Sequence, residues 1–167
     1  MRTHTVIDSP VGVLTLVATD GALSGAYLPE QSHLPDPATF GPRVGTGFEE
    51  AIEQFGEYFA GRRERFTLRT RLAGTDFQRR VWAALTAIPY GRTWTYTQLA
   101  EAVGRPDRLR AVAAANGRNP VAVAVPCHRV VGSDGSLTGY SGGLARKRFL
   151  LDLEQAHGPG PAPGRLF

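Results

Sequence analysis

The chain has 167 residues, of which 42% are hydrophobic and 20% are charged, a composition that suits a globular protein with an apolar core. Its single cysteine, Cys127, excludes an intramolecular disulfide and a cysteine-rich zinc cluster. No stretch approaches the roughly 18 apolar residues of a membrane span, and we expect a cytoplasmic protein. Residues 1–75 carry 7 arginines and 9 acidic residues, whereas residues 76–167 carry 12 basic and 6 acidic residues, so the second half is the candidate for a polyanionic partner.

The first half predicts a small α/β unit. Three short β-rich segments, broken by turn signals at Ser9–Gly12 and Asp20-Gly21, predict an antiparallel meander of strands over 3–7, 13–18 and 22–27. A proline-containing loop follows over 31–42. The apolar positions Ile52, Phe55 and Phe59 then predict an amphipathic helix over 48–59.

Closely spaced helices are predicted from Thr75 onward, and a domain boundary is expected near Gly74. The first helix covers 76–87 and stops before Pro89-Tyr90-Gly91; its apolar stripe is Phe77, Val81, Trp82 and Leu85.

Two short helices with a tight turn between them predict a helix-turn-helix. Thr95 stands three residues before Gln98 in a capping-box arrangement, and Gly104 is a natural terminator. Asp107 is the expected cap of an alanine-rich second helix over 108–116. Such helix pairs also occur in domains that bind no DNA, but the slim alanine surface suits close approach to a groove and phosphate contact better than the reading of base edges.

The remaining segments surround Cys127. An apolar run over 121–125 leads into Pro126–Val131, and Gly132–Gly135 predicts a turn between extended pieces, as in a wing. A glycine-rich loop over 137–143 precedes a last helix over 144–156, and 158–167 is expected to be a flexible tail.

A lone cysteine is more often a small buried hydrophobe than a nucleophile, but His128 and Arg129 beside Cys127 are groups that favour a thiolate. Neighbouring side chains do not face each other in regular structure, so a contact between Cys127 and His128 needs a sharp turn or a bridging water. A histidine base also needs a group that sets its tautomer, and the last helix offers Asp152 and Glu154. Helical geometry puts Glu154 on the inward side, between Leu150 and Leu151, and Asp152 on the opposite side.

The segment Pro126–Val130 resembles the active-site signature of the O6-alkylguanine-DNA alkyltransferases. The match continues, in family order, through Phe77–Trp82, Ile88–Gly91, Tyr96, Arg110–Val112, Asn119-Pro120 and Tyr140–Gly143. The resemblance implies an α+β fold, with an N-terminal α/β, ribonuclease H-like domain with an antiparallel sheet (1–74) and a C-terminal winged helix-turn-helix domain for DNA binding and catalysis (75–157). It implies repair by irreversible, single-turnover transfer of the O6-alkyl group of guanine, and of the O4-alkyl group of thymine, to the protein.

The resemblance also implies roles for individual residues. Cys127 is the alkyl acceptor, His128 its base through a water, and Glu154 the acid that orients His128. Asn119 holds the loop that bears the cysteine, and Tyr96 rotates the lesion outward and is the candidate proton donor to the leaving guanine. The expected DNA contacts are Thr95, Tyr96, Arg110 and Ala111, with Arg110 entering the base stack, and the expected base pocket is Tyr96, Cys127, Val130, Tyr140 and Ser141.

No metal and no cofactor are expected, and the structural zinc of some relatives should be missing because no cysteine precedes Cys127. The expected partner is double-stranded DNA carrying O6-alkylguanine, and no membrane is expected as a partner. We expect the protein to be a monomer, and the sequence leaves open whether it binds DNA cooperatively. Arg118 departs from the small residues that relatives place ahead of the hinge at Asn119.

Two other functions compete with alkyl transfer. A non-catalytic sensor of alkyl lesions is one, but those relatives lack the acceptor cysteine that this chain has. A Cys-His hydrolase is the other, and it leaves the helix-turn-helix and Arg110 without a role.

Overall fold

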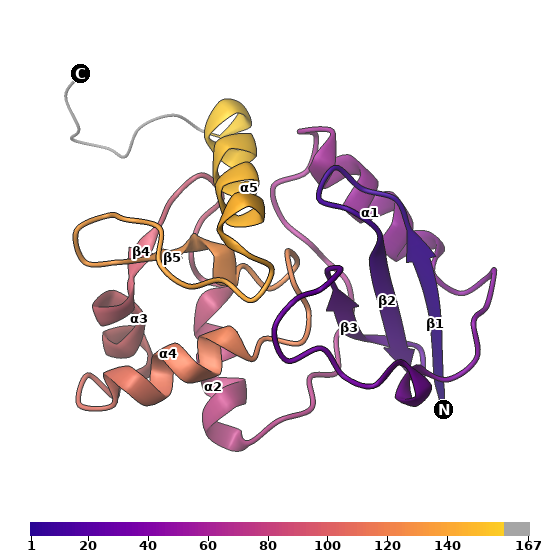
Figure 1. Cartoon of the computed structure of the whole chain (residues 1–167), viewed down its shortest axis with the longest axis horizontal. Coiled ribbons are helices and arrows are strands. Elements are labelled where there is room, and N and C mark those ends of the chain that lie inside the picture. The colour runs from indigo at the N-terminus through magenta and orange to yellow at the C-terminus, as the bar shows by residue number, and fades with distance from the viewer. Residues whose placement is uncertain (159–167) are drawn as a thin grey trace.

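The computed structural model describes residues 1–158 and joins a three-stranded sheet and its helix to a group of helices (Figure 1). The tail predicted over 158–167 lies outside the described residues from 159 onward. No helix among residues 1–158 has the length and apolar character needed to cross a membrane.

The N-terminal sheet is antiparallel in the order β1 (Arg2–Ile7), β2 (Leu14–Thr19), β3 (Ala22–Tyr27), which confirms the predicted meander. Asp20 and Gly21 join β2 to β3 with φ values of 50° and 83°. Two consecutive left-handed residues form the hairpin turn whose twist matches that of the flanking strands, which explains the Asp-Gly pair.

Helix α1 (Glu49–Phe59) forms where an amphipathic helix was predicted, but its buried face differs from the predicted one. Gln54, Phe55 and Tyr58 are buried, whereas Ile52 is 44% exposed. The buried face of the helix is rotated relative to the predicted one because Gln54 forms hydrogen bonds with Thr67 and the Tyr58 hydroxyl donates to Glu154. The prediction that Ile52 faces the core was therefore wrong: polar contacts with distant segments set the orientation of the helix.

The helix-turn-helix is present as predicted. Helix α2 (Asp76–Leu85) precedes it, and α3 (Tyr96–Val103) begins with the expected capping box, in which the Thr95 hydroxyl accepts the Gln98 N–H at 3.1 Å. Gly104 ends α3 with φ 83°, and α4 (Leu109–Gly117) follows after a short turn. The Trp82 indole N–H donates to the Ala115 carbonyl at 2.8 Å and so ties α2 to α4.

Asp107 does not cap α4. Its carboxylate accepts two hydrogen bonds of 3.0 Å from Arg105, and α4 begins at the N-cap Arg108 without a side-chain cap. The two charge-assisted hydrogen bonds from Arg105 are together stronger than a single hydrogen bond from a backbone N–H, so the Asp107 carboxylate pairs with Arg105 and does not cap the helix.

The segment after the cysteine is less regular than predicted. The two-residue strand β5 (Val130–Val131) pairs in parallel with β4 (Trp94–Thr95), and the Gly132 N–H closes the next turn on the Ser136 carbonyl at 2.9 Å. Residues 137–143 form the predicted glycine-rich loop and contain no strand, so only one short strand, β5, borders the turn of the wing. Helix α5 (Leu144–His157) completes the described chain.

The two halves of the chain are joined through the sheet edge and through one core. The segment around Pro120 pairs with the outer edge of β3. The Ala26 N–H donates to the Pro120 carbonyl at 2.9 Å, and the Ala122 N–H donates to the Ala26 carbonyl at 3.1 Å. Buried residues of the sheet, α1, α2, α3, α4 and α5 belong to a single hydrophobic cluster. The segment that leads to Cys127 is therefore anchored on the N-terminal sheet.

Candidate active site

Cys127 lies in a buried turn that Asn119 holds in place. The Asn119 amide donates to the Val125 carbonyl at 2.7 Å, and its oxygen accepts the Val121 N–H at 3.0 Å, so both ends of the apolar run are fixed. Inside this run Val123 has φ 72°, a strained conformation for a β-branched residue. The short 3₁₀ helix η2 (Cys127–Arg129) follows. It is a sharp turn, one of the two arrangements expected to allow a contact between Cys127 and His128.

The turn places His128 and Arg129 against Glu154 of α5. His128 Nε2 lies 2.6 Å from Glu154 Oε2, and Arg129 donates to both carboxylate oxygens, from Nε at 2.8 Å and from Nη2 at 3.0 Å. The Tyr58 hydroxyl of α1 donates to the same Oε2 at 2.6 Å, and the Gly91 N–H to Oε1 at 3.2 Å. Glu154 is fully buried, as its helical position predicted, and accepts hydrogen bonds from four residues.

The surroundings of Glu154 set the proton positions. Burial alone would raise the pKa of this carboxyl, but His128 and Arg129 outweigh it and hold the pKa well below its usual range. Burial lowers the pKa of His128, so its ring is neutral near pH 7. An ionised carboxylate accepts only, so Nε2 carries the proton and Nδ1 is left as an acceptor. Nδ1 is buried and has no hydrogen-bond partner within residues 1–158.

Arg129, which was expected to favour a thiolate, is not among the groups that act on the Cys127 thiol. Burial raises the pKa of the thiol, and the opposing influences are a hydrogen bond from Asn119 and the positive charge of Lys147. Arg129 instead donates hydrogen bonds to the Glu154 carboxylate and, from Nη1 at 2.7 Å, to the Ile88 carbonyl. The adjacency of Arg129 to Cys127 in sequence was misleading because the turn directs the two side chains apart.

Lys147 is a functional candidate that the sequence reading missed. Its side chain is fully buried in α5, and Nζ donates to the carbonyls of Val130, Thr138 and Gly139. Burial lowers its pKa to about 8. Lys147 thus connects the strand after Cys127 to the glycine-rich loop. The only signal was compositional, because it is the single lysine among 19 basic residues.

Cys127 opens into a pocket of about 290 Å³, a volume at the lower end of the range for small-molecule sites. Its lining comes from α3, α4, the cysteine turn, the glycine-rich loop and the N-terminal loop, namely Ser32, His33, Tyr96, Ala113, Asn116, Gly117, Cys127, Gly139, Tyr140 and Ser141. Within the described chain, the Tyr140 hydroxyl and Asn116 Oδ1 are buried without a hydrogen-bond partner. Unsatisfied buried groups in a pocket favour a polar ligand.

The structure brings together most of the residues predicted for the base pocket. Tyr96, Cys127, Tyr140 and Ser141 line it, and the Tyr96 hydroxyl donates to the Thr138 carbonyl at 3.2 Å. Burial raises the pKa of Tyr96. Val130 is fully buried and is not part of the lining, and its carbonyl is occupied by Lys147.

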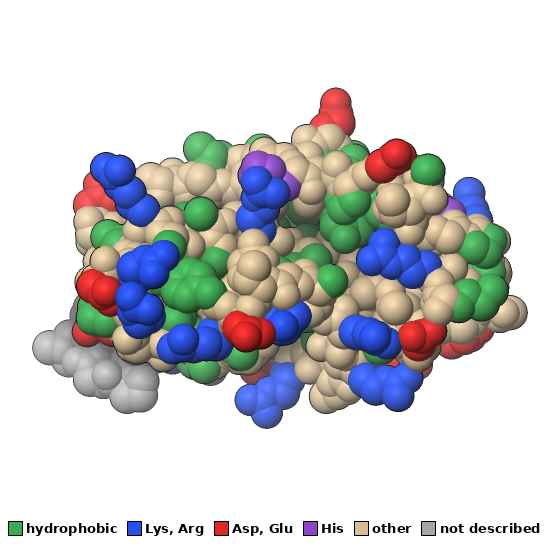
Figure 2. Space-filling view, turned by 90° about the horizontal axis from the view of Figure 1, so that it is seen from below, with side chains coloured by type: hydrophobic (Ala, Val, Ile, Leu, Met, Phe, Trp, Pro, Cys, Tyr) green, Lys and Arg blue, Asp and Glu red, His purple; other side chains and the backbone are tan. Residues whose placement is uncertain are grey.

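The predicted DNA contacts lie at the starts of α3 and α4. Arg110 is exposed and makes no hydrogen bond or ion pair with residues 1–158, whereas Ala111 is half-buried and the Thr95 hydroxyl is used in its cap. Figure 2 shows the molecule from the side on which α2 and α4 lie in Figure 1, and arginine side chains are spread along this face with fewer acidic ones between them. Arg118 is also exposed, beside Asn119.

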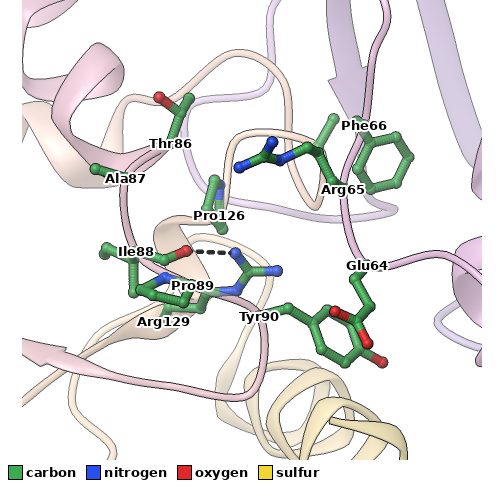
Figure 3. Close-up of a pocket in the computed structure, with 11 residues that line it drawn as sticks. Glu64, Arg65, Phe66, Thr86, Ala87, Ile88, Pro89, Tyr90, Pro126 and Arg129 are labelled. Atoms are coloured by element: carbon green, nitrogen blue, oxygen red, sulfur yellow. Dashed lines mark hydrogen bonds between the residues drawn. The ribbon is translucent and has the colours of Figure 1, made fainter. Parts of the chain in front are cut away.

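A larger hollow of about 580 Å³ is lined by Pro126 and Arg129 but not by Cys127 (Figure 3). Glu64, Arg65 and Tyr90 border it, and the bond from Arg129 to the Ile88 carbonyl crosses one side. Because Cys127 lines the smaller pocket and not this hollow, the smaller pocket is the candidate site. No three His, Cys, Asp or Glu side chains of residues 1–158 are grouped so as to hold a metal ion.

Two family models match nearly the whole chain. The 6-O-methylguanine DNA methyltransferase ribonuclease-like domain matches residues 3–72, and the DNA binding domain of the same name matches residues 76–156.

Individual relatives agree with the family models. The chain is 48% identical over 161 residues to the methylated-DNA--protein-cysteine methyltransferase of Mycolicibacterium paratuberculosis, covering 95% of this chain and 96% of that protein. It is 44% identical to the protein of the same name from Methanosarcina barkeri, covering 91% and 96%. The crystal structure of Mycobacterium tuberculosis OGT in complex with DNA superposes with a TM-score of 0.87 at 46% identity, covering 94% of this chain and 95% of that one.

Proposed function

The chain belongs to the O6-methylguanine-DNA methyltransferase family, and from this premise we propose how its residues carry out direct-reversal repair, the transfer of an alkyl group from DNA to a cysteine of the protein. The acceptor is Cys127. The observation that carries this assignment is the position of Cys127, which lines a base-sized pocket while the next residue, His128, is held by a buried carboxylate.

The DNA is bound through the helix-turn-helix. Arg110 is exposed at the start of α4 and free to enter the base stack, and Tyr96 stands where the pocket meets α3. Thr95 and Ala111 lie beside them and allow the backbone to approach the DNA closely. Because an alkyl carbon on guanine O6 is out of reach in a paired stack, the base must leave the duplex, and the pocket beside Tyr140 and Ser141 receives it.

The chemistry divides proton removal from bond formation. The Cys127 proton passes through a water to Nδ1 of His128, which Glu154 keeps in the correct tautomer. The thiolate attacks the alkyl carbon, the S–C bond forms as the C–O6 bond breaks, and the electron pair of that bond remains on the guanine. Tyr96 donates a proton to the leaving base. Burial favours the neutral thiol at rest, and a thiolate released beside Lys147 meets its positive charge.

The thioether product is stable, so each molecule reacts once. The substrate is double-stranded DNA carrying O6-alkylguanine, and thymine with an O4-alkyl group presents a similar carbon to the same thiol. The protein acts as a monomer, with residues 1–74 as the N-terminal domain and 75–157 as the DNA-binding and catalytic domain.

The test is to mix the protein with a duplex that carries one O6-methylguanine and to analyse its peptides by mass spectrometry. We expect one methyl group on the peptide containing Cys127 and one repaired lesion per molecule. Cys127→Ala, which keeps the fold but removes the sulfur, should bind the duplex and leave the lesion intact. Methylation at another residue, or continued turnover, would contradict the assignment.

A further inference from the structure

The N-terminal half contributes directly to the pocket at Cys127. Ser32 and His33, from the loop after β3, line the pocket together with residues of the C-terminal half. Both residues belong to the loop over 28–36, which connects β3 to the short 3₁₀ helix η1 (Pro37–Phe40). A side chain in this loop can therefore shape a pocket whose cysteine lies in the other half of the chain.

The loop is tied firmly to the glycine-rich loop of the pocket. The Ser32 N–H donates to the Ser141 carbonyl at 2.8 Å, and the buried Gln31 side chain accepts the Leu28 N–H at 2.7 Å. Arg146 of α5 bridges the same two segments, with bonds from Nη1 to the carbonyls of Pro29 at 2.8 Å and Gly142 at 3.1 Å. These bonds hold the backbone that carries His33 at a set distance from the pocket loop.

His33 itself is held in an uncommon conformation. Its φ is 60°, in the left-handed region, and its ring is exposed and makes no hydrogen bond or ring contact with any described residue. Several other lining positions have small side chains or none, as at Ala113, Gly117 and Gly139. Non-glycine residues in the left-handed region cluster at active sites and ligand contacts, and His33, unlike Glu30 with the same φ, also lines the pocket.

We propose that His33 is a specificity-determining residue, whose ring limits the size of the O6-alkyl group that can reach Cys127. The inference rests on the proposed function. Cys127 and His33 line the same pocket of about 290 Å³, so an alkyl group much larger than methyl competes with the His33 ring for space in that pocket. The N-terminal half thus sets the substrate range of the catalytic half.

The test compares two DNA duplexes, one carrying O6-methylguanine and the other O6-benzylguanine, in single-turnover reactions with excess protein. His33→Gly removes the ring and relieves the left-handed strain. We expect the ratio of the benzyl rate to the methyl rate to rise at least about tenfold, the discrimination typical of one methylene-sized obstruction. His33→Trp, with a larger ring, should lower the same ratio.

Glu30→Gly is the matched control. Glu30 lies in the same loop, is exposed, has the same φ of 60° and does not line the pocket, so the change relieves the same strain without opening the site. An unchanged ratio in His33→Gly, or an equal rise in Glu30→Gly, would overturn the proposal. Failure of the wild-type protein to demethylate the methylated duplex would instead refute the proposed function, so the two outcomes remain separate.

Discussion

Glu154→Gln should separate the two tasks of the buried carboxylate, which are to balance the charge of Arg129 and to set the tautomer of His128. The wild-type carboxylate accepts hydrogen bonds from Tyr58, His128, Arg129 and Gly91. An amide of the same shape keeps one acceptor oxygen and places an NH₂ group where the other oxygen was. That NH₂ group faces donors whichever way the amide is turned.

The expected losses follow from burial. The Glu154 side chain is 1% exposed and the Arg129 side chain 8%, so neutralising the carboxylate leaves a buried guanidinium without its counter-charge. Breaking a buried pair in this way costs about 3–5 kcal/mol of unfolding free energy, and we expect the lower end because the amide oxygen still accepts a bond. Loss of the correct histidine tautomer removes general-base assistance, which slows methyl transfer by about 100-fold or more.

The assay is the single-turnover rate of methyl transfer from an O6-methylguanine duplex, with urea unfolding followed by circular dichroism on the same samples. Asp152→Asn is the matched control, because it neutralises an exposed acid on the same helix. It should change the unfolding free energy by less than about 0.5 kcal/mol and leave the rate unaltered. A folded Glu154→Gln variant that reacts at the wild-type rate would refute the role of Glu154 in orienting His128.

Three further predictions use other parts of the site. Arg110→Ala should slow repair of duplex DNA far more than reaction with free O6-methylguanine base, since Arg110 is exposed and acts on the stack; equal slowing in both assays would remove its role in extrusion. Lys147→Met should shift the pH profile of Cys127 alkylation by iodoacetamide to higher pH, because the charge of Lys147 lowers the thiol pKa, while Arg148→Met on the exposed side of α5 should leave the profile in place. Folding lowers the pKa of both His128 and Glu154. Both groups therefore stabilise the folded protein above their unfolded pKa values, about 6.5 and 4.3, and this contribution to the unfolding free energy is lost as the pH falls below those values toward the folded ones. A urea unfolding midpoint that stays constant from pH 8 to 4 would contradict this prediction.

Much of the local structure is predictable because its causes lie within a few residues. The Thr95–Gln98 capping box, the left-handed stop at Gly104 and the Asp20-Gly21 hairpin all appear as expected. The inward position of Glu154 is equally local, since it depends only on the period of a helix. The two local predictions that were wrong, Ile52 in the core and Asp107 as a cap, each lost to a competing polar contact.

The sequence by itself determined the family, the order of the elements, the helix-turn-helix and the candidate acceptor cysteine, because these depend on motifs and periodicity along the chain. Only the tertiary structure decided which groups act on Cys127: Asn119 and Lys147 influence its thiol, and Arg129 turns away to Glu154. Only the tertiary structure brings Tyr58, 96 residues from Glu154, onto the carboxylate, and His33 into the pocket. The physical reason is that burial and hydrogen bonding act through space, and no local pattern records which distant segment will close against the cysteine turn.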